Sequence, residues 1–229
     1  PLCGGLDPPG KPGALSVVNE MSSCGMRVLA IASVFVDWEP GFRDFKSLKG
    51  GATLLGLVGQ IDPPREDAKT AIASCKAAGI RLMMLTGDHP LAGLAIAREL
   101  GIVRDGDCAM DGSLLEAMGE AELRDRLGTI AVFSRVEPSQ KLRIVTALQA
   151  CGEVVAMTGD GVNDAPALAQ ADVGVAMGKS GTDVAKDAAS IVITDDRFST
   201  IVEAVEQGRV VYGNLKKVIL YLFATSVDE

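Results

Sequence analysis

The sequence predicts an α/β domain built on a mostly parallel sheet. Short apolar segments typical of buried strands alternate with longer segments that carry apolar residues at helical spacing. Twice, an apolar segment ends in Thr-Gly-Asp and leads into a helical pattern, at Thr86 and again at Thr158. Open α/β sheets bind ligands at the carboxyl ends of their parallel strands. We therefore expect both Thr-Gly-Asp turns to lie at such a sheet edge and to carry function.

The composition favours a globular protein and argues against a general nucleic-acid binder. Of the 229 residues, 48% are hydrophobic and 23% are charged, which suits a folded core. The net charge of -8 opposes binding to a phosphate backbone, which requires a basic face. The five cysteines are scattered and never spaced as Cys-x-x-Cys, so we expect free thiols in a reducing compartment. Residues 1–13 are rich in Pro and Gly and show no signal-peptide pattern.

In the first 101 residues, proline and glycine mark where the expected elements end. Pro63 and Pro64 stop a strand because proline cannot donate to a ladder, and Pro64 suits the first turn of the next helix. Gly79 ends that helix. The expected elements are a helix over 14–25, a buried strand over 28–32, a polar linker over 37–51, a strand over 54–61, a helix over 65–78, a strand over 80–85 and a helix reaching 101.

The rest of the chain continues the alternation. Residues 112–127 are charged and amphipathic, which predicts one helix with a solvated face. Pro138 begins a helix with a regular apolar face. The apolar run 218–224 is too short by itself to cross a bilayer, which takes about 20 residues. The further expected elements are strands over 130–133, 154–157 (buried), 173–178 and 191–193, an Ala-rich helix after Asp164, a helix over 183–189 and a helix from Ser199 onward.

Two carboxylates beside the second Thr-Gly-Asp turn are candidate metal ligands. Asp160 and Asp164 can share one Mg²⁺, with Asn163 as a neutral oxygen donor between them. The alternative is that these residues only form a turn and cap a helix. The matching turn at Thr86 favours the metal interpretation, because two such turns at one sheet edge are an improbable coincidence.

Three other sites also have two interpretations. Lys141 falls in the first turn of a helix, where a cation opposes the helix dipole, so it is either a plain surface lysine or the partner of an anion. His89, the single histidine, is interpreted as a helix-start residue rather than a proton carrier. For Asp195 and Asp196, a turn or capping role is favoured over a metal site.

Four motifs, taken together, resemble a known family. IDPPRED, MLTGDHPLAGLAIARELGI, VEPSQK and TGDGVNDAPAL are similar, in order and spacing, to the C-terminal part of the cytoplasmic region of type II P-type cation-transporting ATPases, the calcium-pump group. The similarity runs from about Met26 to the end. That family belongs to the haloacid-dehalogenase-like phosphotransferases, so the resemblance implies a Rossmann-like phosphorylation domain. It also implies ATP as substrate, Mg²⁺ as cofactor and a transported cation, with Ca²⁺ favoured.

The resemblance further implies a domain plan. Residues 1–36 would end a nucleotide-binding domain, 37–53 would be a hinge, 54–208 a partial phosphorylation domain, and 209–229 the stalk and start of the fifth transmembrane helix. The chain would then lie at the cytoplasmic face of a membrane, and its partners would be the remaining N-terminal and transmembrane parts of the same pump.

Individual roles follow from the same resemblance. Asp160 matches the Mg²⁺ ligand, and Lys141 matches a lysine that neutralises phosphoryl charge. Glu229 matches a ligand of the transported cation, although Ser226 stands where many related pumps have Asn, which leaves the ion open. The remaining implied site residues are Thr86, Gly87, Asp88, Asn163 and Asp164 for phosphoryl handling, with Asp164 also supporting the metal, and Arg27, Asp62 and Arg65 for the hinge and nucleotide side.

The phosphorylated aspartate of that family begins a DKTGT motif, and the 229 residues contain no DKTG and no Asp-x-Asp-x-Thr/Val. We therefore expect a fragment that lacks the strand bearing the acceptor and cannot phosphorylate itself. Two alternatives belong to other classes. A soluble haloacid-dehalogenase-type phosphatase should keep its own nucleophile and lack the amphipathic tail at 209–229, and a non-catalytic binding piece would tolerate loss of the acidic residues.

Overall fold

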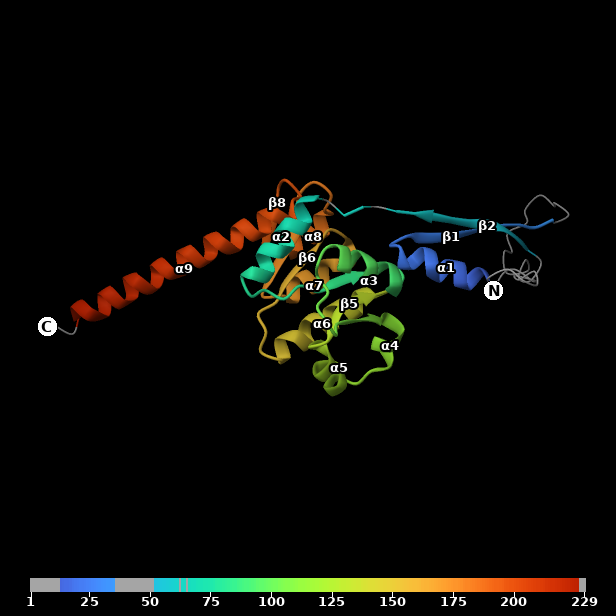
Figure 1. The fold of residues 1–229 in the computed structure, drawn as a ribbon. Helices are drawn as coiled ribbons and strands as arrows, with labels where there is room; N and C mark the ends of the chain where they lie inside the picture. The colour runs from blue at the N-terminus through green and yellow to red at the C-terminus, as the bar shows by residue number, and fades with distance from the viewer. Residues whose placement is uncertain (1–12, 36–51, 62, 65, 227–229) are drawn as a thin grey trace.

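The computed structural model describes residues 13–35, 52–61, 63–64 and 66–226. Figure 1 shows an α/β body from which a pair of strands projects on one side and a single long helix on the other. The described strands of the body form two parallel three-stranded sheets, with helices packed against them. The predicted α/β class with mostly parallel strands is therefore confirmed.

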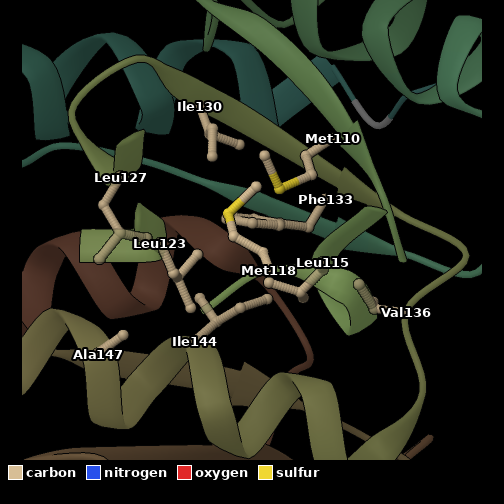
Figure 2. Close-up of a cluster of buried hydrophobic side chains, with 10 residues drawn as sticks. All are labelled: Met110, Leu115, Met118, Leu123, Leu127, Ile130, Phe133, Val136, Ile144 and Ala147. Carbon is tan, nitrogen blue, oxygen red and sulfur yellow. The ribbon is translucent and has the colours of Figure 1, made fainter. Parts of the chain in front are cut away.

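The first sheet has β5 (Ile130–Ser134) at its centre, between β3 (Met84–Thr86) and β4 (Cys108–Asp111). All five residues of β5 are buried, because helices cover both faces of this sheet. Leu115, Leu123 and Ile144, from α4 (Gly112–Ala117), α5 (Glu120–Leu127) and α6 (Pro138–Ala150), pack on one face around Phe133, as Figure 2 shows. The other face packs against α2 (Glu66–Ala77) and α3 (Pro90–Glu99) through Ile72 and Ala97.

The second sheet has β7 (Val173–Met177) at its centre, between β6 (Ala156–Gly159) and β8 (Ile191–Ile193). Its core includes Val145, Met157 and Leu168, which come from α6, β6 and α7 (Ala165–Gln170). The short helix α8 (Asp183–Ala188) joins this core through Ala185. Because Val145 of α6 belongs to this core while Ile144 belongs to the other, α6 links the two sheets.

The projecting strands are β1 (Arg27–Ser33) and β2 (Thr53–Gln60), which pair antiparallel next to α1 (Ala14–Ser23). The projecting helix is α9 (Phe198–Ser226), which packs along α2 and is held there by a hydrogen bond of 2.9 Å from Arg209 Nη2 to the Ala78 carbonyl. Its apolar side chains between Val210 and Phe223 are exposed. Within the described residues, none of the helices has the length and apolar content needed to span a membrane.

Several sequence expectations are wrong in detail. The strand expected to be buried at 28–32 is mostly exposed, because β2 is its one strand partner in the described part of the chain and α1 covers it only in part. The single helix over 112–127 is two helices, interrupted at Met118 and Gly119. The apolar side chains Leu115, Met118, Leu123 and Leu127 are buried, whereas Leu114 is 60% exposed together with the charged side. The strand expected at 154–157 begins two residues later, and Val154 is 85% exposed.

Two strands also differ from the prediction: one is shorter than expected, and one was not predicted. The strand predicted over 80–85 is limited to β3, so residues 80–83 lead into it without pairing. Strand β4 was not predicted, because it has only four residues and directly follows the polar run Asp105-Gly106-Asp107. The described parallel strands form two sheets where one was expected, and β1 and β2 form a separate antiparallel pair.

Candidate functional site

The two Thr-Gly-Asp turns follow the carboxyl ends of β3 and β6, as the sequence predicted. Both strands are outer strands: within the described residues β3 pairs with β5 alone and β6 with β7 alone. Leu85 of β3 packs against the cores of both sheets. The polar residues at the two strand ends therefore surround a region that is bounded by two unpaired strand edges.

An ion pair fixes one of the predicted acidic residues. Lys141 Nζ, in the first turn of α6, donates to Asp164 Oδ1 at 2.6 Å, and the side chains are only 18% and 10% exposed. Asp164 Oδ2 accepts a second hydrogen bond, from the Gly161 amide at 3.1 Å. A Cβ added at Gly159 would lie 2.5 Å from the Asp164 Cβ, so only glycine fits under this carboxylate. Asp164 is thus held by both of its oxygens.

Asp160 and Asn163 are in a different environment, because both are exposed. The Asp160 carbonyl accepts from the Thr182 amide at 2.8 Å, whereas its carboxylate has no hydrogen-bond or ion-pair partner in the described part of the chain. This donor set fits Mg²⁺, which binds one or two carboxylates and takes its other ligands from water and phosphate. Among the described residues no three His, Cys, Asp or Glu side chains form a metal-binding group, so the protein offers no closed cage here.

The turn after β3 forms a second polar group. The Thr86 hydroxyl oxygen accepts from the Asp88 amide at 3.1 Å, and the hydroxyl donates to Asp88 Oδ2 at 3.3 Å. Asp88 Oδ1 accepts from Arg27 Nε at 2.9 Å and also from Arg27 Nη2. The hydrogen bond from Arg27 and the adjacent carboxylate charge raise the pKa of the Arg27 guanidinium. Asp88 therefore connects the predicted hydroxyl ligand to the predicted nucleotide-side arginine.

A cavity of about 230 Å³ lies beside this group, where α1 and β1 meet the turn after β3. Arg27, Asp88, His89 and Arg135 contribute to its wall. His89 Nδ1 accepts from the Leu91 amide at 3.3 Å and caps α3, which confirms its interpretation as a helix-start residue. The cavity wall thus carries two guanidiniums, Arg27 paired with Asp88 and Arg135 paired with Asp111.

Sequence reasoning missed Arg135. This residue follows β5 directly, has a φ of 53°, and places Nη1 3.5 Å from Asp111 Oδ2. A left-handed backbone is uncommon outside glycine, and such residues gather at functional sites. The available signal was its position at the carboxyl end of the strand next to β3.

The structure brings the predicted residues together in two groups: Lys141 with Asp164 beside Asp160, and Thr86 with Asp88 and Arg27. No hydrogen bond or ion pair within the described ranges joins one group to the other. Asp62, Arg65 and Glu229 lie outside the described residues. Asp195 accepts from the Arg197 amide and the Thr200 hydroxyl at the start of α9, which confirms its capping role.

The fold is of the Rossmann-like α/β class, which binds ligands at the carboxyl ends of its parallel strands, and carboxylates, a hydroxyl and a lysine gather at those ends here. The haloacid dehalogenase-like hydrolase family matches residues 22–172, well over half of the chain. The chain belongs to this family.

Curated relatives extend the similarity along almost the whole chain. It is 50% identical over 94% of its length to calcium-transporting ATPase 1 of Bacillus cereus, and 48% identical over 93% to the cation-transporting ATPase pma1 of Synechocystis. It is 46% identical over 99% to the probable cation-transporting ATPase F of Mycobacterium tuberculosis. The chain spans 24% to 25% of the length of these relatives. The resemblance to calcium-pump-like P-type ATPases is thereby confirmed.

Proposed function

We propose that these residues are part of an ATP-driven cation pump that works through an aspartyl-phosphate intermediate. They supply the groups that bind Mg²⁺ and stabilise the phosphoryl group, and the acceptor aspartate lies elsewhere in the polypeptide. The observation that carries this proposal is the pair of Lys141 and Asp164 at the carboxyl end of β6. The names of the relatives, the chain's share of about a quarter of their length, and the absence of DKTG from the 229 residues support it.

In the proposed reaction, the acceptor carboxylate attacks the γ-phosphorus of ATP while the bond to the ADP oxygen breaks, and water later cleaves the acyl phosphate. Lys141 Nζ would donate to a phosphoryl oxygen and offset its charge, with Asp164 holding the ammonium in position. Thr86 would donate its hydroxyl to another phosphoryl oxygen, and Gly87, with no Cβ, would let the backbone approach. Asp160, with Asn163 nearby, would hold Mg²⁺, which would supply positive charge against the phosphate.

The unpaired edges of β3 and β6 suggest where the acceptor belongs. One further parallel strand between them would continue both sheets and bury the two edges, which are otherwise prone to pair with other chains. Its carboxyl end would fall beside Thr86 and Asp160, because parallel strands end at one edge of a sheet. An aspartate there would face the phosphoryl-binding groups from both sides.

The other parts of the chain receive roles in the same proposal. Arg27 and the cavity beside Asp88 would bind the nucleotide phosphates. Residues up to 36 would form the end of a nucleotide-binding domain. Residues 37–53 would be the hinge, and Asp62 and Arg65 would act at the hinge and nucleotide side. The end of α9 would lead through residues 209–229 toward the membrane, with Glu229 binding the transported cation, Ca²⁺ being favoured.

The proposal is tested by incubating the 229 residues with radiolabelled ATP and Mg²⁺ and quenching with acid. We expect no acid-stable phosphoprotein, because the acceptor is not among these residues, while Mg²⁺ should still perturb the amide signals of Asp160 and its neighbours in an NMR titration. A phosphorylated aspartate within the chain would refute the assignment of the acceptor. A titration that leaves Asp160 unperturbed would refute the metal role.

A further inference from the structure

Asp196 organises a glycine-rich turn in another part of the fold. Its Oδ1 accepts from the Lys179 amide at 2.9 Å and its Oδ2 accepts from the Ser180 amide at 2.7 Å. Asp196 is only 8% exposed and has a φ of 58°, a left-handed conformation that a residue other than glycine seldom adopts. A buried carboxylate in a strained backbone position requires a reason beyond a surface turn.

The turn that Asp196 holds, residues 178–182, runs from the end of β7 to α8 and contacts Asp160. The Thr182 amide donates to the Asp160 carbonyl at 2.8 Å, and the Gly178 amide donates to the Ile193 carbonyl at 2.7 Å. A Cβ at Gly181 would lie 2.0 Å from the Met177 carbonyl oxygen, so the turn has no room for a side chain at this position. The connection from Asp196 to Asp160 therefore passes through closely packed backbone.

The neighbouring Asp195 makes only local hydrogen bonds, as a capping residue does. Its oxygens accept from the Arg197 amide and the Thr200 hydroxyl, within five residues along the chain. The amides that donate to Asp196 are 16 and 17 residues away and lie beside a different strand. These amide donors, Lys179 first, lower the pKa of Asp196 to about 2, so the carboxylate stays charged further into the acid range than an ordinary aspartate. The two adjacent aspartates thus serve different segments.

We propose that Asp196 is a positioning residue for Asp160, acting through the turn at 178–182. The inference rests on the proposed function, in which Asp160 is the Mg²⁺ ligand. The two amide hydrogen bonds fix the start of the turn, and the Thr182 amide at its end fixes the main chain of Asp160. Removing a group that holds a metal ligand in position without contacting the metal typically lowers metal affinity about 10-fold to 100-fold.

The test compares Asp196→Asn with Asp195→Asn in the ¹⁵N-labelled chain. Each variant removes one carboxylate charge, and only the first should loosen the turn. We expect Asp196→Asn to speed hydrogen exchange at the Lys179, Ser180 and Thr182 amides and to raise the Mg²⁺ dissociation constant, read by NMR titration, about 10-fold. Asp195→Asn should leave both measurements at their wild-type values. Equal exchange and equal Mg²⁺ affinity in the two variants would overturn the inference.

Asp160→Asn separates this inference from the function on which it depends. If wild type and Asp160→Asn titrate alike, the metal role of Asp160 is wrong, and the proposed function fails at this site. If the titration depends on Asp160 but not on Asp196, only the positioning role is wrong. Circular dichroism checks that each variant is folded before its Mg²⁺ affinity is compared with wild type. If Asp196→Asn unfolds, Asp196→Ser, which keeps one acceptor oxygen, takes its place. The Mg²⁺ affinity of Asp196→Ser should lie between those of wild type and a fully loosened turn.

Discussion

Lys141 Nζ lies 2.6 Å from Asp164 Oδ1 and joins the first turn of α6 to the turn after β6. It is the one ion pair among the described residues in which both side chains are less than one fifth exposed. A lysine in the first turn of a helix opposes the helix dipole. The carboxylate of Asp164 offsets that cost, and it also keeps the ammonium at the sheet edge, where a phosphoryl group would bind.

Replacing Lys141 with Ala should destabilise the fold. The substitution leaves the buried Asp164 carboxylate with one hydrogen bond fewer, which typically costs about 1–3 kcal/mol. The free energy of unfolding in urea measures this loss. Lys186→Ala is the control, because its partner Asp183 is fully exposed at 4.0 Å and the pair should contribute nothing measurable. Equal shifts for the two variants would contradict the structural role of the Lys141 pair.

Gly159→Ala should displace Asp164. The new Cβ would lie within 2.5 to 3.0 Å of three atoms of that side chain, and such overpacking costs about 1–3 kcal/mol. Gly128→Ala is a matched control, since its φ is −57° and a Cβ there meets nothing within 4 Å. Thermal unfolding should show a lower midpoint for the first variant and an unchanged or slightly higher midpoint for the second. An unchanged midpoint for Gly159→Ala would show that the carboxylate is loosely held.

Stability should fall in acid because several carboxyl groups have lowered pKa values. The pKa of Asp111 is lowered chiefly by the Ser113 amide, that of Asp195 by the Thr200 hydroxyl, and that of Asp196, to about 2, by the Lys179 amide. A lowered pKa in the folded state means that the stabilisation is complete above the unfolded pKa, about 3.9, and is lost as the pH falls through the folded value.

Urea unfolding between pH 7 and pH 2.5 checks this expectation. The midpoint should hold steady down to about pH 4 and then decline. Asp196→Asn should be less stable at neutral pH and should decline less steeply below pH 4, because one of the titrating groups is gone. Wild-type and variant curves that run parallel through this range would exclude Asp196 as a contributor.

Arg27→Ala should weaken ATP binding with little effect on folding. The side chain is 65% exposed, so its pair with Asp88 should contribute less than about 1 kcal/mol to stability. A hydrogen bond between an arginine and a phosphate contributes about 1.5–3 kcal/mol, which corresponds to roughly a 10-fold or greater loss of affinity in calorimetric titration. Arg126→Ala, which breaks an exposed pair with Glu122, is the control. Equal ATP affinities for the two variants would remove Arg27 from the site.

Local signals predicted much of the fold. Pro138 begins a helix and Gly79 ends one in the structure where the sequence placed them, because proline and glycine act on the backbone directly. The break in the charged segment 112–127 was not predicted, because the amphipathic pattern continues across Met118 and Gly119. Strand β4 was missed because its four residues carry no pattern long enough to detect.

The features that the sequence did not predict depend on contacts between residues far apart in the chain. The exposure of β1 depends on what covers it, which no local pattern encodes. The sequence left Lys141 between two interpretations, and only the fold, which places it beside a residue 23 positions away, shows its partner. Arg135 became visible as a candidate only because its left-handed backbone and its place in the cavity wall depend on β5 lying next to β3.

We propose that these residues stabilise a phosphoryl group whose acceptor lies elsewhere in the polypeptide. The most direct test is acid-quenched phosphorylation by radiolabelled ATP of the 229 residues alone and of the same residues joined to the polypeptide encoded upstream. We predict no label on the chain alone, a labelled aspartate in the longer protein, and a loss of about 10-fold or more in that label with Lys141→Ala. Acid-stable label on the chain alone, or undiminished label with Lys141→Ala, would contradict the claim.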